Sequence, residues 1–348
     1  GTGLAQAKDR DTVECDPFLI GGTPTADIIW VVDESGSMSN NRIDVANNAK
    51  DFFARAVTSG LDFRMGVTNV VDPGSSSKAA VGKFCSKLYK FNASKQLVNT
   101  ADAKDLGGTD RFLQPSEQAV FESCVLNPPG YEGGSEYGLV NARKAVTQHL
   151  PRKAGDQTRI RPGATLVIIV ATDEMPNSLT NKDPFGVFEY MACNVSAAKK
   201  KQILTGFYKQ DMDLYTGVSH KGEGAAVMHV IGGVCNNKCG ADIAHGYIEI
   251  SQALGGISAD VCQKNLGASL QLMIDSITGK ASPAVLQYVP ISASLAVAVG
   301  PKVLARSRVK GFDYSAANNS LVFISTPIQK GTQVAASYRR WVEQATIE

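Results

Sequence analysis

The clearest pattern in the first part of the chain is a continuous apolar, β-branched run, Asp27 to Val32, followed at once by polar turn residues. Such runs are typical of parallel strands that are buried on both faces. From Arg42 to Val57 the apolar residues instead recur at helical spacing. The two segments therefore predict a strand followed by a helix.

The alternation of strands and helices continues as far as Gly279. Further strands are predicted at Phe63 to Val71, Thr165 to Val170 and Ala225 to Ile231, helices at Gly138 to Leu150 and Tyr247 to Leu254, and an apolar segment at Leu266 to Ile277 continues the series. This order predicts an α/β fold with a doubly wound, mostly parallel, Rossmann-like sheet. The stretch from Asp72 to Gly134 is the least regular part.

After Gly279 the pattern changes to short alternating strands separated by turn residues, which predicts a small all-β domain. These strands are Ser294 to Val299, Val303 to Val309, Phe312 to Tyr314, Leu321 to Ile324 and Gln333 to Trp341. We expect residues 1–25 to form an irregular arm that packs on this domain. Residues 26–279 then form the α/β domain, and residues 280–348 form a small β-sandwich-like domain.

The net charge of the chain does not indicate a binding partner. A net charge of +2 over 348 residues is too small to indicate nucleic acid or an anionic membrane. The longest apolar runs, Ala164 to Ala171 and Ile291 to Val299, are shorter than the roughly 20 residues that cross a bilayer. We therefore predict no transmembrane segment. No signal peptide is visible at Gly1, so an exported protein would be a mature or trimmed form, and a lipid anchor could precede this residue.

The seven cysteines are scattered, without the repeated CxxC pairs that build zinc sites. This spacing favours disulfides and an oxidising, extracytoplasmic location over a set of inert buried thiols. The odd number leaves one cysteine unpaired or intermolecular. We predict the pairs Cys85–Cys124 and Cys235–Cys239, because both bracket irregular loops that gain most from a crosslink.

The candidate chemistry lies directly after the first strand, where Asp33-Glu34-Ser35-Gly36-Ser37 forms an Asp-x-Ser-x-Ser motif. Ligands of open parallel sheets bind at the carboxyl ends of strands. Alternate residues of such a turn can direct one carboxylate and two hydroxyls to one centre, an all-oxygen set that hard cations such as Mg²⁺ prefer. The alternative is that Asp33 and the serines only cap the following helix.

The motif and its strand resemble those of the von Willebrand factor A (VWA) and integrin I-domain family, over roughly Ala26 to Gly279. The family's metal-ion-dependent adhesion site adds a Thr from a second loop and an Asp from a third. The apolar strand that ends in Thr172-Asp173 matches the third loop, so the resemblance makes Asp173 the second carboxylate. The second loop matches Gly133-Gly134-Ser135, although Ser135 departs from the usual Thr, and Gly107-Gly108-Thr109 is a rival.

The resemblance implies a binding module, not an enzyme. Asp33, Ser35, Ser37, Ser135 and Asp173 would hold Mg²⁺, or Mn²⁺ or Ca²⁺, and a protein or surface ligand would present a carboxylate to the ion. The sequences of segments such as Gly134-Ser135-Glu136-Tyr137-Gly138 are similar to those of exported VWA proteins of myxobacteria. Some of these proteins are lipid-anchored, and they include a gliding-motility adhesin. This implies a cell-surface or secreted protein. The alternative is an extracytoplasmic scaffold or envelope-assembly factor with a structural metal.

Other chemistries fit the sequence poorly. The serine in Gly134 to Gly138 is out of register with the Gly-x-Ser-x-Gly of a hydrolase nucleophile elbow, and the four histidines lack HExxH spacing. Cys235, Cys239, His245 and Cys262 match no common zinc spacing, which favours a disulfide-bearing loop. The Lys199 to Lys201 run indicates a solvated helix face more than an anion-binding patch.

Overall fold

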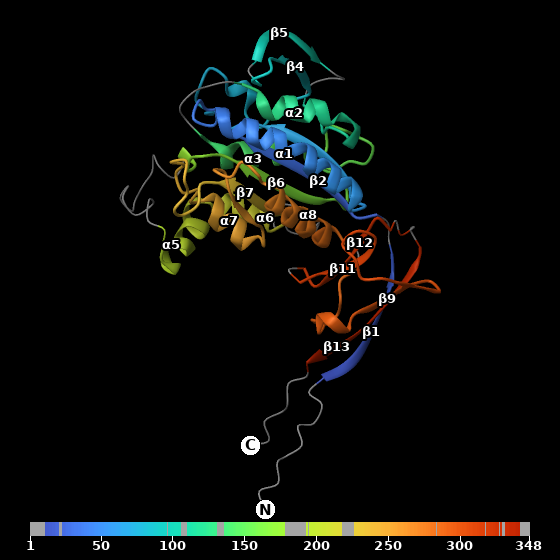
Figure 1. Cartoon of the computed structure of the whole chain (residues 1–348). Helices are drawn as coiled ribbons and strands as arrows, with labels where there is room; N and C mark the ends of the chain where they lie inside the picture. Colours follow the sequence, from blue (N-terminus) through green and yellow to red (C-terminus); the bar gives the residue numbers. More distant parts are fainter. Residues whose placement is uncertain are drawn as a thin grey trace, which may run out of the picture. The chain divides into compact units, whose positions relative to one another are not determined.

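The computed structural model describes residues 11–20, 23–95, 97–105, 110–130, 136–177, 193, 195–217, 226–282, 284–316, 318–326, 328 and 331–341. The chain divides into two compact units (Figure 1). One contains Thr25–Val57 and Asp62–Ile277, and the other contains Gly1–Pro24, Thr58–Leu61 and Thr278–Glu348. No helix among the described residues is long and apolar enough to cross a membrane.

The first unit is built on a five-stranded sheet in which every pair of neighbouring strands is parallel. Its strands are β2 (Thr25–Val32), β3 (Asp62–Thr68), β6 (Thr165–Ala171), β7 (Val227–Gly232) and β8 (Ser258–Asp260). They lie in the order β3-β2-β6-β7-β8. Taken in chain order this is the doubly wound arrangement 2-1-3-4-5, whose strand order reverses between the first and third strands. The reversal therefore lies between β2 and β6.

Helices cover both faces of this sheet, because alternate residues of the buried strands point to opposite sides. On one face Trp30 packs edge-on against Phe52 of one helix and Phe121 of another. On the other face Ile29 and Val31 join a core that includes Leu139. Among the described residues the helices of this unit are α1 (Ser39–Thr58), α2 (Gln118–Leu126), α3 (Gly138–Gln148), α5 (Ala197–Gln202), α6 (Lys209–Tyr215), α7 (Tyr247–Ala253) and α8 (Gly267–Ala281), whose last four residues belong to the second unit. The prediction of an α/β fold is confirmed.

The stretch predicted to be least regular contains more structure than its sequence pattern indicated. Between Asp72 and Gly134 lie the 3₁₀ turns η1 (Lys78–Ala80) and η2 (Pro115–Glu117), the antiparallel pair β4 (Lys87–Phe91) and β5 (Leu97–Asp105), and α2. A π-helical turn, η3 (Ile203–Phe207), joins α5 to α6. The strand predicted from Ala225 begins at Val227, and Ala225 itself lies outside the described residues.

The second unit holds a four-stranded antiparallel sheet in the order β1-β13-β9-β10 and a separate hairpin of β11 and β12. The bounds are β1 (Asp11–Leu19), β9 (Ala296–Val299), β10 (Lys302–Leu304), β11 (Gly311–Ser315), β12 (Ser320–Ile324) and β13 (Gln333–Trp341), with a 3₁₀ turn, η4 (Ser292–Ser294), before β9. The prediction of an irregular arm was wrong for Asp11–Leu19, because this segment forms a strand that pairs with β13 along its whole length.

The strand predicted at Val303 to Val309 is also shorter than expected. It ends at Leu304, and the Ser307 side chain accepts hydrogen bonds from the backbone N–H groups of Val309 and Lys310 (3.1 and 3.2 Å). A serine that accepts from the next residues in this way builds a turn, which competes with strand pairing.

Two disulfides crosslink the first unit, and one of the two predicted pairs is correct. Cys85 is bonded to Cys124, as predicted, but Cys239 is bonded to Cys262, so Cys235–Cys239 was wrong. Among the described residues Cys15, Cys193 and Cys235 are free thiols, and Cys235 is hydrogen-bonded to Cys193.

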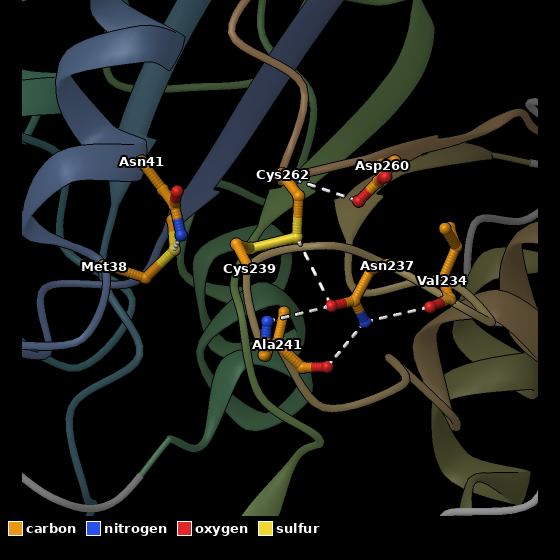
Figure 2. The surroundings of a disulfide bond; sticks show 9 residues. Met38, Asn41, Val234, Asn237, Cys239, Ala241, Asp260 and Cys262 are labelled. Atoms are coloured by element: carbon orange, nitrogen blue, oxygen red, sulfur yellow. Dashed lines mark hydrogen bonds between the residues drawn. A yellow bond between two sulfur atoms is a disulfide. The ribbon is translucent and has the colours of Figure 1, made fainter.

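The loop after β7 explains the wrong pairing (Figure 2). The Asn237 amide donates to the carbonyls of Val234 (2.9 Å) and Ala241 (2.7 Å), which folds the loop on itself. The Asp260 carboxylate at the end of β8 accepts from the N–H of Cys262 (3.0 Å). These bonds place Cys239 beside Cys262, a pairing between distant segments that sequence spacing does not reveal.

Removing the Cys85–Cys124 disulfide with Cys85→Ser and Cys124→Ser together is expected to destabilise the protein by about 3 kcal/mol, because the bond closes a long loop and restricts the unfolded chain. The bond spans 39 positions of sequence and both cysteines are buried. Urea denaturation followed by circular dichroism measures the loss. Cys15→Ser, which removes an exposed free thiol, is the control, and an equal loss in both proteins would contradict the prediction.

Candidate metal centre

The candidate centre lies where the strand order of the parallel sheet reverses. Asp33 directly follows β2, and Thr172 and Asp173 directly follow β6, the neighbouring strand across the reversal. The N–H of Asp33 donates to the carbonyl of Ala171 (2.9 Å), so the two strand ends are joined at this point. Crevices at such reversals are the usual binding places of doubly wound sheets.

The Asp33 carboxylate is fully buried and held through both oxygens. Its Oδ1 accepts from the N–H of Ser35 (2.8 Å), and its Oδ2 accepts from the hydroxyl of Thr172 (2.7 Å). Each carboxylate oxygen has a second lone pair beyond the one used in these bonds, as a metal ligand requires. Thr172 therefore orients Asp33, a role that the sequence analysis did not assign, although Thr172 directly precedes the predicted ligand Asp173.

The hydroxyls of Ser35 and Ser37 lie close to the carboxylate of Asp173. The two hydroxyl oxygens are 2.8 Å apart and hydrogen-bonded, and the Ser37 hydroxyl donates to Oδ1 of Asp173 (3.2 Å). Neighbouring oxygen ligands of an octahedral Mg²⁺ lie about 3 Å apart, since the metal–oxygen distance is about 2.1 Å. The spacing of these three oxygens and their chemistry both fit a small hard cation.

The backbone around the ligands is fixed by a second set of contacts. The Arg42 guanidinium donates from Nη1 to the carbonyls of Asp33 (3.0 Å) and Ser35 (2.8 Å), so the first turns of α1 hold the motif loop. On the other side, the N–H of Asp242 donates to the carbonyl of Asp173 (2.8 Å). The sequence positions of Arg42 and Asp242 do not predict these contacts.

Three carboxyl groups around the centre have pKa values raised above their ordinary range. Burial and the charge of Asp33 raise the pKa of Asp173 to about 6. Burial, a hydrogen bond with Glu174 and the charge of Asp33 raise the pKa of Glu136 to about 9. Burial raises the pKa of Glu34 to about 8. Carboxyl groups are thus concentrated in a place of low solvation that favours their neutral forms, and a bound cation would favour their charged forms.

The second-loop ligand is not placed, because both Ser135 and its rival Thr109 lie outside the described residues. Among the described residues no three His, Cys, Asp or Glu side chains are grouped as metal ligands. A cation at this place would therefore depend on two carboxylates together with serine hydroxyls. The four described members of the predicted set, Asp33, Ser35, Ser37 and Asp173, are brought together by the contacts given above.

Comparison with known proteins finds no matching family model and no matching curated protein. Among solved structures, the pilus adhesin SpaC from Lactobacillus rhamnosus GG is similar at 14% identity and a TM-score of 0.41, over 96% of this chain and 41% of that chain. Human COPII-coat protein Sec24c is similar at 13% identity and a TM-score of 0.39, over 95% of this chain and 42% of that chain. This chain thus spans less than half of either structure, and at these values the likenesses assign no function.

Proposed function

We propose that this protein is a metal-dependent binding module of the VWA type. Asp33, Ser35, Ser37, Asp173 and a second-loop hydroxyl, Ser135 or Thr109, hold a Mg²⁺-type cation. A protein or surface ligand then presents a carboxylate to that cation. The observation that carries the proposal is the continuous contact from Ser35 through Ser37 to Asp173 beside the buried Asp33, at the reversal of the sheet.

The proposed ligands are of two kinds, charged carboxylates and neutral hydroxyls. Asp33 and Asp173 supply two negative charges that balance a divalent ion, and the serine hydroxyls supply neutral oxygens. Thr172 and the Ser35 N–H keep the Asp33 carboxylate in one orientation. A bound cation would supply a Lewis-acidic centre for a ligand's carboxylate, because the serine hydroxyls and water are neutral ligands and a carboxylate could replace such a water.

The two disulfides support an extracytoplasmic location, because such bonds persist in oxidising compartments. We propose a cell-surface or secreted adhesin, with a lipid anchor as one means of attachment. Gliding motility, implied only by the resemblance in sequence, is one process in which such an adhesin would act.

Binding to carboxylated agarose, compared with amide-capped agarose, tests the proposal. The wild-type protein is expected to bind the carboxylated matrix in Mg²⁺, to be released by chelator, and to ignore the amide-capped matrix. Asp33→Ala is expected to lose this binding. Asp51→Ala is the matched control, because it removes the same charge from an exposed position of α1. Binding that survives chelator, or that is equal in Asp33→Ala, would contradict the proposal and favour the alternative of an extracytoplasmic scaffold with a structural metal.

A further inference from the structure

Two cysteines outside both disulfides meet at the loop that follows β7. Cys235 belongs to this loop, and Cys193 lies between β6 and α5 in the sequence. Both are free thiols, and the two thiol groups are hydrogen-bonded to each other. We propose that Cys193 and Cys235 form a third disulfide site, which closes under oxidising conditions and ties the segment before α5 to the β7 loop.

The first argument is that the two side chains already touch. A disulfide requires its sulfur atoms to be in contact, and residues whose side chains point apart cannot form one. The hydrogen bond between the thiols of Cys193 and Cys235 puts the two sulfur atoms in contact, so only a short further approach separates them from a covalent bond. Cys193 is exposed and Cys235 is partly exposed, so an oxidant from the solvent can reach the pair.

The second argument is that the loop around Cys235 is held in place. The Cys239–Cys262 disulfide crosslinks this loop to the segment after β8 (Figure 2). The carbonyl of Val234, directly before Cys235, accepts from the backbone N–H of Asn237 (3.2 Å) and from its side-chain amide (2.9 Å). One sulfur of the pair is therefore held on an ordered loop, and less conformational entropy is lost when the bond closes.

The third argument concerns the alternative use of two adjacent thiols, which is a metal site. Structural zinc takes four protein ligands. Among the described residues no third His, Cys, Asp or Glu side chain joins the pair in a group of metal ligands. A disulfide needs only the two sulfur atoms that are present. Conditions that oxidise Cys85–Cys124 and Cys239–Cys262 also suit a further pair of thiols in contact.

The reaction needs an oxidant, and we assign this role to a disulfide of the surroundings, either a small molecule or a thiol oxidoreductase. The Cys193 thiolate attacks one sulfur of that disulfide, forms a mixed disulfide and expels one thiolate. The Cys235 thiolate then attacks the Cys193 sulfur and expels the second thiolate. The pair thus loses two electrons, and its two protons pass through solvent to the expelled thiolates, so the oxidant leaves as two thiols.

The order of the two steps follows from the surroundings of the thiols. Burial and the neighbouring Cys193 thiol raise the pKa of Cys235 to about 11, which leaves little Cys235 thiolate at neutral pH. The exposed Cys193 is therefore the thiol that reacts first with the external disulfide. Once Cys193 is in the mixed disulfide it carries no charge, and its contribution to the raised pKa of Cys235 is lost.

Peptide mapping by mass spectrometry under non-reducing conditions tests the proposal. The full chain is incubated with oxidised glutathione, and the remaining thiols are alkylated before digestion. We expect a peptide that joins Cys193 to Cys235, beside the two peptides that contain the Cys85–Cys124 and Cys239–Cys262 bonds. Maps in which Cys193 and Cys235 are both alkylated, both carry glutathione, or are joined to other cysteines overturn the proposal.

Two variants test whether the thiols react with each other. Cys235→Ser removes the second nucleophile, so Cys193 is expected to accumulate a glutathione adduct that the wild type lacks. Cys15→Ser, which removes an exposed free thiol of the other compact unit, is the control and is expected to keep the Cys193–Cys235 peptide. Circular dichroism checks that both variants are folded. Equal amounts of the Cys193 adduct in the wild type and in folded Cys235→Ser overturn the proposal.

Discussion

Replacing Asp27 with alanine is expected to destabilise the first unit by about 3–5 kcal/mol, because it leaves two arginines without their buried partner. Asp27 lies in β2 and is fully buried. Its carboxylate accepts from Nε and Nη2 of Arg64 (3.0 and 2.6 Å) and from the backbone N–H and Nε of Arg161 (2.6 and 2.9 Å). Arg64 is itself 5% exposed, so the solvent cannot replace the lost carboxylate.

Chemical denaturation of the purified variant, followed by far-UV circular dichroism, measures this loss. Asp62→Ala is the matched control, because Asp62 also pairs with Arg161 (2.8 Å) but its side chain is 51% exposed. Exposed ion pairs contribute at most about 1 kcal/mol. If the two substitutions lower the free energy of unfolding equally, the buried Asp27 cluster does not have the structural role assigned to it.

Asp33→Ala is expected to abolish cation binding while the fold persists, and this is the largest functional effect that we predict. The substitution removes a full charge from the proposed ligand set, whereas loss of the Ser35 or Ser37 hydroxyl can be compensated by water. It also removes the negative charge that helps to raise the pKa of Asp173. Without a cation, relief of that repulsion therefore opposes the loss of the bonds from Thr172 and Ser35.

Thermal unfolding with and without Mg²⁺ separates this effect from simple destabilisation. A cation that binds the native state stabilises it by about 2.7 kcal/mol at a concentration one hundred times its Kd. The wild type and the control Asp51→Ala are expected to gain this stability, Ser35→Ala is expected to gain it at higher Mg²⁺, and Asp33→Ala is expected to gain none. An equal gain in Asp33→Ala would remove Asp33 from the ligand set.

Four strands of the parallel sheet, β2, β3, β6 and β7, could be predicted because each is mostly apolar, whereas the short polar β8 was not predicted. Burial on both faces requires an apolar run, as in Thr165 to Ala171, and the boundaries follow from the polar residues beyond it. β1 could not be found in this way. Its partner β13 lies at the far end of the chain, and residues such as Val13 and Leu19 remain exposed, so its local sequence carries little pattern. Pairing between distant segments is not encoded in local periodicity.

At the candidate centre, too, some features follow from the local sequence and others depend on contacts between distant segments. Asp33 could be singled out because a carboxylate and two serines directly follow an apolar strand, and Asp173, two residues after β6, was singled out from the family resemblance. The orienting role of Thr172, the anchoring of the loop by Arg42 and the burial of Glu136 depend on how β6, α1 and α3 meet around the strand ends. These contacts become visible only when the order of the strands is known.

The central claim is that a cation held by Asp33 binds the carboxylate of a ligand. Water-proton relaxation by bound Mn²⁺ tests this claim most directly. The wild-type protein is expected to enhance relaxation, because Mn²⁺ in the site keeps exchangeable water. Acetate is expected to reduce the enhancement by displacing that water, the isosteric acetamide is expected to leave it unchanged, and Asp33→Ala is expected to show none. Enhancement that persists in Asp33→Ala, or that acetate and acetamide affect equally, would contradict the metal-dependent recognition of a carboxylate.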